Sequence, residues 1–208
     1  MLLRGLNVAS TIINELRTRW TATELLRVEK LLLENRIASG ALPTYLHGED
    51  TLVDLRGYVL SQMIHNLQCK FVDLSYMSLF HAGQFDYCTF ENCYFIAIEF
   101  HANLGSKFYN CSFTSAKLQK TVLRGEFSRC DFINANLSGV LASQARFSHC
   151  RFDNCNLRSA AFYNCIFDNC SFSAAKFGKG SIANSKFTGN RPDDASLLDT
   201  VCEGAIFK

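Results

Sequence analysis

The ten cysteines are the residues of this 208-residue chain that could do the most chemistry. Cysteines pair as disulfides in short secreted domains, and closely spaced Cys-x-x-Cys pairs bind zinc. The sequence contains no Cys-x-x-Cys pair. Most of its cysteines instead begin the triplet Cys-x-Phe: Cys69, Cys88, Cys93, Cys111, Cys130, Cys150, Cys165 and Cys170.

The first place of this triplet also accepts Ala, Gly and Ser, as at Ala135, Gly125 and Ser185. A position that tolerates these residue types is selected for small size. We therefore predict that the cysteines are buried as small hydrophobic residues, with raised pKa values and little reactivity. A metal site and structural disulfides are the alternatives.

Few other residues suggest catalysis or ligand binding. His81 and His101 lie twenty residues apart and could stack on one face, but two imidazoles alone make a poor metal site. His149 has no carboxylate beside it in the sequence, and Gly178-Lys-Gly-Ser181 resembles a phosphate-binding loop that lacks its earlier glycine. We expect no catalytic residue, no metal or other cofactor, no small-molecule substrate, and therefore no enzyme.

A bulky apolar residue recurs every five residues, and the small residue lies two places before it. Neither a helix, with a period of 3.6 residues, nor a strand, with a period of 2, requires that spacing. We expect the core at these two kinds of position: Phe127, Phe132, Phe147, Phe152, Phe162, Phe167, Phe172, Phe177, Phe187, Cys130, Cys150, Cys165 and Cys170.

The five-residue step is less regular toward both ends of the chain. It shortens to four residues at Leu104 and Phe108 and again before Phe127. Before about Val72 the sequence does not define the phase. The upstream step holds for Phe80, Phe85, Phe90, Phe95 and Phe100, and Pro192 and Cys202 occupy two bulky positions near the end.

Units such as Ala135-Asn-Leu-Ser-Gly139, Ala102-Asn-Leu104 and Cys130-Asp-Phe132 resemble the pentapeptide-repeat family, whose consensus is Ala-Asp/Asn-Leu-x-x. The resemblance implies an all-β solenoid. It would be a right-handed quadrilateral β-helix with four units per coil, in which the bulky and the small residue both point inward. We expect this solenoid over residues 51–208.

Residues 1–50 are expected to form an α-helical N-terminal cap. Thr21-Ala-Thr-Glu24 resembles a capping box before a leucine-rich stretch, and Gly40 is a candidate helix stop. A shorter helix is expected over about 10–19. Such a cap would cover the open first coil, which otherwise exposes unpaired strand groups. A separate docking or oligomerisation helix is the alternative.

Outward positions are expected to carry the function, because a solenoid without a pocket works through its faces. Residues 105–191 hold twelve Lys and Arg against four Asp and Glu, a net charge of +8, whereas residues 52–104 and 192–208 each have −3. The candidate interaction face combines a basic side with an apolar spot: Arg158, Lys176, Lys179, Leu141 and Tyr163.

We expect a non-enzymatic interaction scaffold of the bacterial cytoplasm that presents flat faces to an acidic protein. The apolar stretches are too short for a membrane span, and no secretory leader opens the chain. Direct nucleic-acid binding is not expected, because flat β sides lack the interleaved exposed aromatics that single strands prefer. A homodimer through the C-terminal coil is plausible by resemblance.

The resemblance also implies an alternative function. Some pentapeptide-repeat proteins imitate the DNA duplex with an acidic rod, bind DNA gyrase and confer tolerance to quinolones or toxins. Such mimicry needs negative charge along the rod. A strip near Asp86, Glu91 and Glu99 could supply it, although the middle of this chain is basic. An effector delivered into host cells is a third class, for which the sequence shows no signature.

Overall fold

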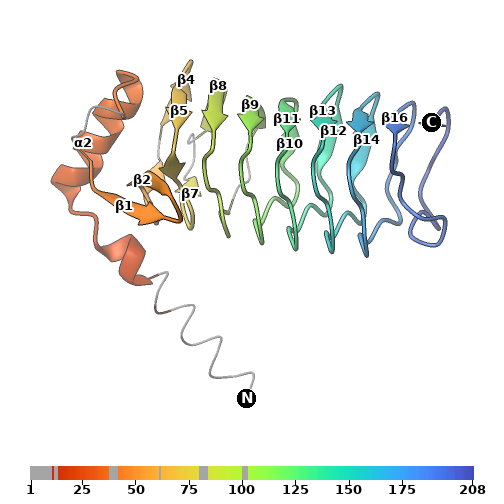
Figure 1. Cartoon of the computed structure of the whole chain (residues 1–208), viewed down its shortest axis with the longest axis horizontal. Coiled ribbons are helices and arrows are strands. Elements are labelled where there is room, and N and C mark those ends of the chain that lie inside the picture. Colours follow the sequence, from red (N-terminus) through yellow and green to blue (C-terminus); the bar gives the residue numbers. More distant parts are fainter. Residues whose placement is uncertain (1–10, 12–13, 38–41, 61, 80–83, 100–102) are drawn as a thin grey trace.

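Parallel strands in strict register build this molecule as a stack of coils. Phe127 lies opposite Phe147, Phe147 opposite Phe167, and Phe167 opposite Phe187, so equivalent residues are twenty positions apart. Twenty residues are four five-residue units, and each unit therefore forms one side of a coil. The coils follow one another along the long axis of the rod, with the helical cap at one end and the C-terminus at the other (Figure 1).

The computed structural model describes residues 11, 14–37, 42–60, 62–79, 84–99 and 103–208. Six residues named above lie outside these ranges: Gly40, Phe80, His81, Phe100, His101 and Ala102.

The described elements are one long helix and many short strands. The helix is α2 (Ala22–Leu33). The strands are β1 (Thr44–His47), β2 (Asp50–Asp54), β3 (Val59–Leu60), β4 (Met63–His65), β5 (Gln68–Lys70), β6 (Val72–Asp73), β7 (Ser78–Leu79), β8 (Gln84–Glu91), β9 (Asn103–Tyr109), β10 (Val122–Leu123), β11 (Glu126–Ser128), β12 (Leu141–Ser143), β13 (Arg146–Ser148), β14 (Ala161–Tyr163), β15 (Ile166–Asp168), β16 (Lys186–Thr188) and β17 (Ile206–Phe207).

Phenylalanine rings form two stacked columns along the axis. In one column Phe127 stacks on Phe147 with ring centroids 5.0 Å apart, and in the other Phe132 stacks on Phe152 at 4.9 Å. These distances match the spacing of neighbouring strands, so each coil adds one ring to each column. Rings of adjacent columns meet edge to face, as Phe147 and Phe152 do at 5.3 Å. The core is therefore continuous through the rod.

The corner between two units places a residue in the left-handed backbone region. That residue lies two places after the bulky one, and in many units it is an asparagine: Asn134, Asn154, Asn164, Asn169 and Asn184 all have φ between 50° and 58°. Asparagine tolerates this region better than most residues with a side chain. The repeated asparagine is thus a turn signal with the same period as the core.

The Asp or Asn before the bulky residue also has a local role. The Asp131 side chain accepts a hydrogen bond from the Ile133 amide at 2.9 Å, and the Asn136 side chain accepts one from the Ser138 amide at 3.1 Å. Such bonds to a backbone amide two residues on stabilise a turn. They explain why the unit prefers Asp or Asn at this place.

Two shortened units change the register without breaking the core. Phe85 lies opposite Leu104, whereas Phe90 lies opposite Phe108, and the pairing of β8 with β9 shifts between Asp86 and Thr89. Phe90 and Phe108 still stack at 5.1 Å. The irregularity is therefore absorbed in the backbone at a corner, and the ring column continues.

Cys69 does not occupy the small position that its Cys-x-Phe triplet predicts. It lies opposite Phe90 and therefore fills a bulky position in the first coils. Phe71, which the triplet predicts as the bulky residue, has φ of 54° and lies half-buried at a corner. The sequence leaves the phase open here, because cysteine is small enough for one position and apolar enough for the other.

The N-terminal region contains the expected capping box. The Thr21 hydroxyl accepts a hydrogen bond from the Glu24 amide, and the Glu24 carboxylate accepts one from the Thr21 amide at 2.8 Å. The helix ends at Leu33, well before Gly40, which lies outside the described residues. The antiparallel pairing of β1 with β2 was not expected from the sequence.

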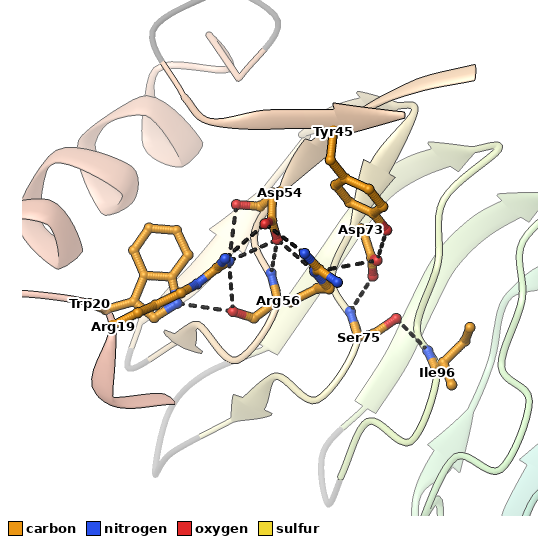
Figure 2. A network of polar contacts seen from close by, with 8 residues as sticks. All are labelled: Arg19, Trp20, Tyr45, Asp54, Arg56, Asp73, Ser75 and Ile96. Carbon is orange, nitrogen blue, oxygen red and sulfur yellow. Dashed lines mark hydrogen bonds and ion pairs between the residues drawn. The ribbon is translucent and has the colours of Figure 1, made fainter. Parts of the chain in front are cut away.

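A polar network joins the segment before α2 to the first coils (Figure 2). Arg19 binds Asp54 through two hydrogen bonds of 2.7 Å, and Arg56 binds the same carboxylate at 2.9 and 3.0 Å. The Tyr45 hydroxyl of β1 donates to Asp73 in the next coil. Burial and the Asp73 carboxylate raise the pKa of Tyr45, which therefore remains a donor.

The network continues through backbone groups. Trp20 donates its indole N–H to the Arg56 carbonyl at 3.0 Å, and the Ser75 amide donates to Asp73 at 2.8 Å. Burial acts to raise the pKa of Asp54, but hydrogen bonds from the Arg19 and Arg56 guanidinium groups outweigh it and hold the pKa well below its usual range. The charged Asp54 carboxylate thus links the segment before α2 to the first coils.

Candidate interaction faces

The cysteines lie inside the rod. All of them are free thiols, and each is buried except Cys202, which is partly exposed. Burial raises the pKa of Cys155 to about 12 and that of Cys165 to about 11, and it also raises the pKa of Cys130. In the part of the chain that the structure describes, no three His, Cys, Asp or Glu side chains form a cluster that could hold a metal ion. The core phenylalanines named above are buried as well.

His149 and a neighbouring carboxylate both contact one serine. The Ser148 hydroxyl lies 2.9 Å from His149 Nδ1 and 3.5 Å from Asp168 Oδ2. In a Ser-His-Asp triad the histidine lies between the other two, so that it can accept the serine proton while the aspartate orients it. Here the serine occupies the middle. This arrangement does not activate the serine as a nucleophile.

One side of the rod is basic and rich in hydrogen-bond donors. Its rows are in register, because Lys117, Asn136, Asn156 and Lys176 pair successively in a parallel ladder. We call this side the basic face and define it by its outward residues: Lys117, Gln119, Lys120, Asn136, Ser138, Asn156, Arg158, Lys176, Gly178 and Lys179.

The next side of the rod has no charged side chain over residues 141–143, 161–163 and 181–183, and in the following coil it carries Val201 and the exposed Glu203. Leu141 lies opposite Ala161, and Ser143 lies opposite Tyr163. Leu141 is 54% exposed and Tyr163 is 45% exposed, which is high for large apolar side chains. We call this side the apolar face and define it by these residues: Leu141, Ser143, Ala161, Tyr163, Ser181, Ala183 and Val201.

A groove of about 550 Å³ opens at the C-terminal end of the basic face. It is lined by three of the candidate residues, Arg158, Lys176 and Lys179, together with Gly178 and the irregular segment 195–199. We call it the Gly178 groove. The structure thus brings the three basic candidates together, and it places Leu141 and Tyr163 on the adjacent face.

The sequence pattern could place these residues on two sides but could not reveal the groove. The groove depends on residues 194–199, which form turns instead of continuing the regular coil. Polar side chains in and next to this segment form hydrogen bonds within it: those of Asp193, Asp194 and Ser196. The Ser196 amide, for example, donates to the Asp193 side chain at 2.7 Å. The available signal in the sequence is Pro192, which takes the place of a bulky residue in the five-residue step.

The acidic residues of the N-terminal part are balanced by nearby bases. Glu91 pairs with Lys70 at 2.6 Å and Glu99 pairs with Lys117 at 3.8 Å. Asp86 lies 3.5 Å from His65 Nδ1. The strip that could imitate DNA phosphates is therefore partly neutralised across neighbouring coils.

Comparison with known proteins agrees with this geometry. Residues 126–162 and 150–189 match the family of pentapeptide repeats, with eight copies. This part of the chain, residues 126–189, carries pentapeptide repeats. The predicted fold, a quadrilateral β-solenoid of pentapeptide repeats with a short helical cap at its N-terminus, is confirmed.

Solved structures that align with this chain are distant from it in sequence. A trypsin-treated variant of QnrB1, a plasmid-mediated fluoroquinolone resistance protein, aligns with a TM-score of 0.59 and 14% identity over 74% of this chain and 79% of its own. A second trypsin-treated QnrB1 variant aligns with a TM-score of 0.50 and 15% identity, over 70% of this chain and 82% of its own. HetL is a pentapeptide-repeat protein involved in the regulation of heterocyst differentiation in the cyanobacterium Nostoc sp. strain PCC 7120. It aligns with a TM-score of 0.28 and 15% identity, over 73% of this chain and 86% of its own.

The two QnrB1 similarities show the fold alone. A search of curated proteins finds no significant match to this chain. Among the described residues, no helix is long and apolar enough to cross a membrane.

Proposed function

We propose that this protein is a non-enzymatic scaffold of the bacterial cytoplasm that binds an acidic protein partner through its basic face and the adjoining apolar face. The observation that carries the proposal is the position of Arg158, Lys176 and Lys179, which line one groove beside exposed Leu141 and Tyr163. Apolar anchors surrounded by charge are typical of protein interfaces, and complementary charge adds specificity and association rate.

Capture from an extract of the source organism, with the purified chain as bait and quantified by mass spectrometry, tests this proposal. One variant combines Arg158→Glu, Lys176→Glu and Lys179→Glu, and another combines Leu141→Ser with Tyr163→Ser. Both variants are expected to lose the same bound protein, and that protein is expected to carry an acidic segment.

A matched control changes three exposed bases on other positions: Arg129→Glu, Arg146→Glu and Lys186→Glu. This control has the same net charge as the first variant, so it separates a local contact from a general charge effect. Equal loss of the partner from the control would contradict the proposal.

Topoisomerase-directed protection is the second candidate function. It is supported by the fold shared with QnrB1, a fluoroquinolone resistance protein. The ion pairs of Glu91 with Lys70 and of Glu99 with Lys117 argue against it, because mimicry of DNA needs unpaired negative charge. A DNA gyrase supercoiling assay, with and without a quinolone, separates the two. Protection of gyrase by micromolar protein would favour this second function.

A further inference from the structure

Gly178 interrupts a row of side chains on the basic face. The Ser159 amide donates to the Gly178 carbonyl at 2.9 Å, and the Lys179 amide donates to the Asp199 carbonyl at 2.8 Å. This register places Arg158, Gly178 and Leu198 in successive coils of one row. Because Gly178 has no side chain, the row has a gap between Arg158 and Leu198. A Cβ atom there would meet only the Leu198 carbonyl oxygen, at 3.5 Å.

Positive charge dominates the lining of the Gly178 groove. Arg158, Lys176 and Lys179 are exposed, and none of them forms an ion pair with a described residue. Asp199 is the one carboxylate among the lining residues. A guanidinium and two ammonium groups offer only donors, which suits carboxylates and other oxyanions.

Apolar surface lies beside these charges. The base of the groove includes Ala175 and Phe177, which are buried, and one wall carries Leu198, which is 73% exposed. Lys179 stands at the corner that leads to the apolar face, two residues before Ser181. A partner segment that leaves the groove at this corner would meet apolar side chains.

We infer that the Gly178 groove receives an acidic side chain of a protein partner, held by Arg158, Lys176 and Lys179, while an apolar residue next to it packs on Leu198. The inference rests on the proposed function, because it names the site at which the basic face would hold its partner. A protein fits better than a single-stranded nucleic acid, since the aromatic residue of the groove, Phe177, is buried and cannot stack on a base.

Fluorescence anisotropy with the full-length chain tests the inference. The probe is a labelled peptide that repeats Glu-Leu-Glu-Ala three times, and its control repeats Gln-Leu-Gln-Ala. The acidic peptide is expected to bind about tenfold more tightly, because a few exposed charge pairs together give a factor of this size. Its affinity is expected to fall when NaCl rises from about 50 to about 200 mM, because salt screens exposed charges.

Two double variants identify the site. Lys176→Glu with Lys179→Glu is expected to weaken the acidic peptide about tenfold, whereas Arg146→Glu with Lys186→Glu, which changes the net charge equally on another side, is expected to leave it unchanged. Equal binding of the Glu and Gln peptides, or equal weakening by both variants, would overturn the inference. Tighter binding of single-stranded oligothymidylate through the same lysines would also overturn it.

The result also separates this inference from the function on which it depends. If Leu141→Ser with Tyr163→Ser abolishes capture of the cellular partner, but Lys176→Glu with Lys179→Glu changes neither capture nor peptide binding, the scaffold function stands and the groove is not its acidic-residue site. If none of these variants changes capture, the proposed function fails as well.

Discussion

At the scale of single residues, volume at the inward positions determines the fold. Phe152 stacks between Phe132 at 4.9 Å and Phe172 at 5.4 Å, and it is fully buried. The cysteines beside these rings are buried and act as small apolar groups. A thiol fits where alanine or glycine also fits, which explains why so many cysteines form no disulfide.

Phe152→Ala is expected to reduce the free energy of unfolding by about 3–5 kcal/mol, because it removes a ring from the middle of a column and leaves a cavity. Chemical denaturation followed by fluorescence or circular dichroism measures this loss. Phe71→Ala, at a half-buried corner, is the control and is expected to cost much less. A loss below about 1 kcal/mol for Phe152→Ala would show that the ring is not a core residue.

At the scale of elements, the position of the N-terminal helical segment depends on a close contact between the backbones of Leu16 and Gly57. Gly57 has φ of 70°, and a Cβ atom on it would lie 2.7 Å from the carbonyl carbon and oxygen of Leu16. The segment before α2 is therefore seated on Gly57 and fastened by the Arg19–Asp54 pair. Glycine is required here for space as well as for its backbone conformation.

Gly57→Ala is expected to destabilise the cap by about 1–3 kcal/mol more than Gly139→Ala, because Leu16 must shift. Gly139 is a matched control, since its φ is 66° but its added Cβ would meet only Lys120 Cγ at 3.5 Å. Chemical denaturation measures the difference in the free energy of unfolding. In limited trypsin digestion, Gly57→Ala is expected to be cleaved near Arg19 earlier than Gly139→Ala. Equal effects of the two substitutions would contradict the contact.

The same element predicts a pH dependence. Asp54 has a lowered pKa in the folded protein, so the unfolded chain binds its proton more readily. Wild type is expected to be more stable than Asp54→Asn by about 1–2 kcal/mol near pH 7, since hydrogen bonds to a partly exposed charged group are lost. The difference is expected to persist above about pH 5 and to shrink below about pH 4. A difference that grows in acid would contradict the role of Asp54.

The sequence predicts the regular elements well and the irregular ones poorly, for physical reasons. The five-residue spacing of bulky residues from Phe127 to Phe187 predicts the core directly, because only the inward positions require large apolar side chains. Cys69 fits either inward position, so the triplet misplaces it. Strand β1 and the Gly178 groove arise where the repeat stops, and there the tertiary contacts, not a local pattern, determine the conformation.

At the scale of the whole molecule, the coil that contains β17 exposes apolar side chains, among them Val201 at 53% and Ile206 at 48%. Strand β17 pairs with β16, Phe207 stacks on Phe187 at 5.1 Å, and Arg191 lies over the Phe207 ring. Apolar surface of this kind is suited to an interface with a second copy. We therefore predict a homodimer, with about twice the monomer mass in light scattering at micromolar concentration, and Phe207→Glu is expected to reduce it to the monomer. A monomer mass for the wild type would remove this prediction.

Charge is also organised along the whole rod. The basic middle lies between two acidic segments, and four of its bases without an ion pair among the described residues lie on the basic face: Lys120, Arg158, Lys176 and Lys179. This arrangement favours one working surface over a rod that imitates DNA along its length. A bound partner is therefore expected to cover the basic face and to leave the bases on the other sides of the rod exposed.

Lysine acetylation of the captured complex, mapped by mass spectrometry, tests this expectation most directly. We predict that the partner protects Lys176 and Lys179 from acetylation, while Lys186, which is also exposed, is modified as fast as in the free protein. Protection of Lys186 with unchanged modification of Lys176 and Lys179 would contradict the account.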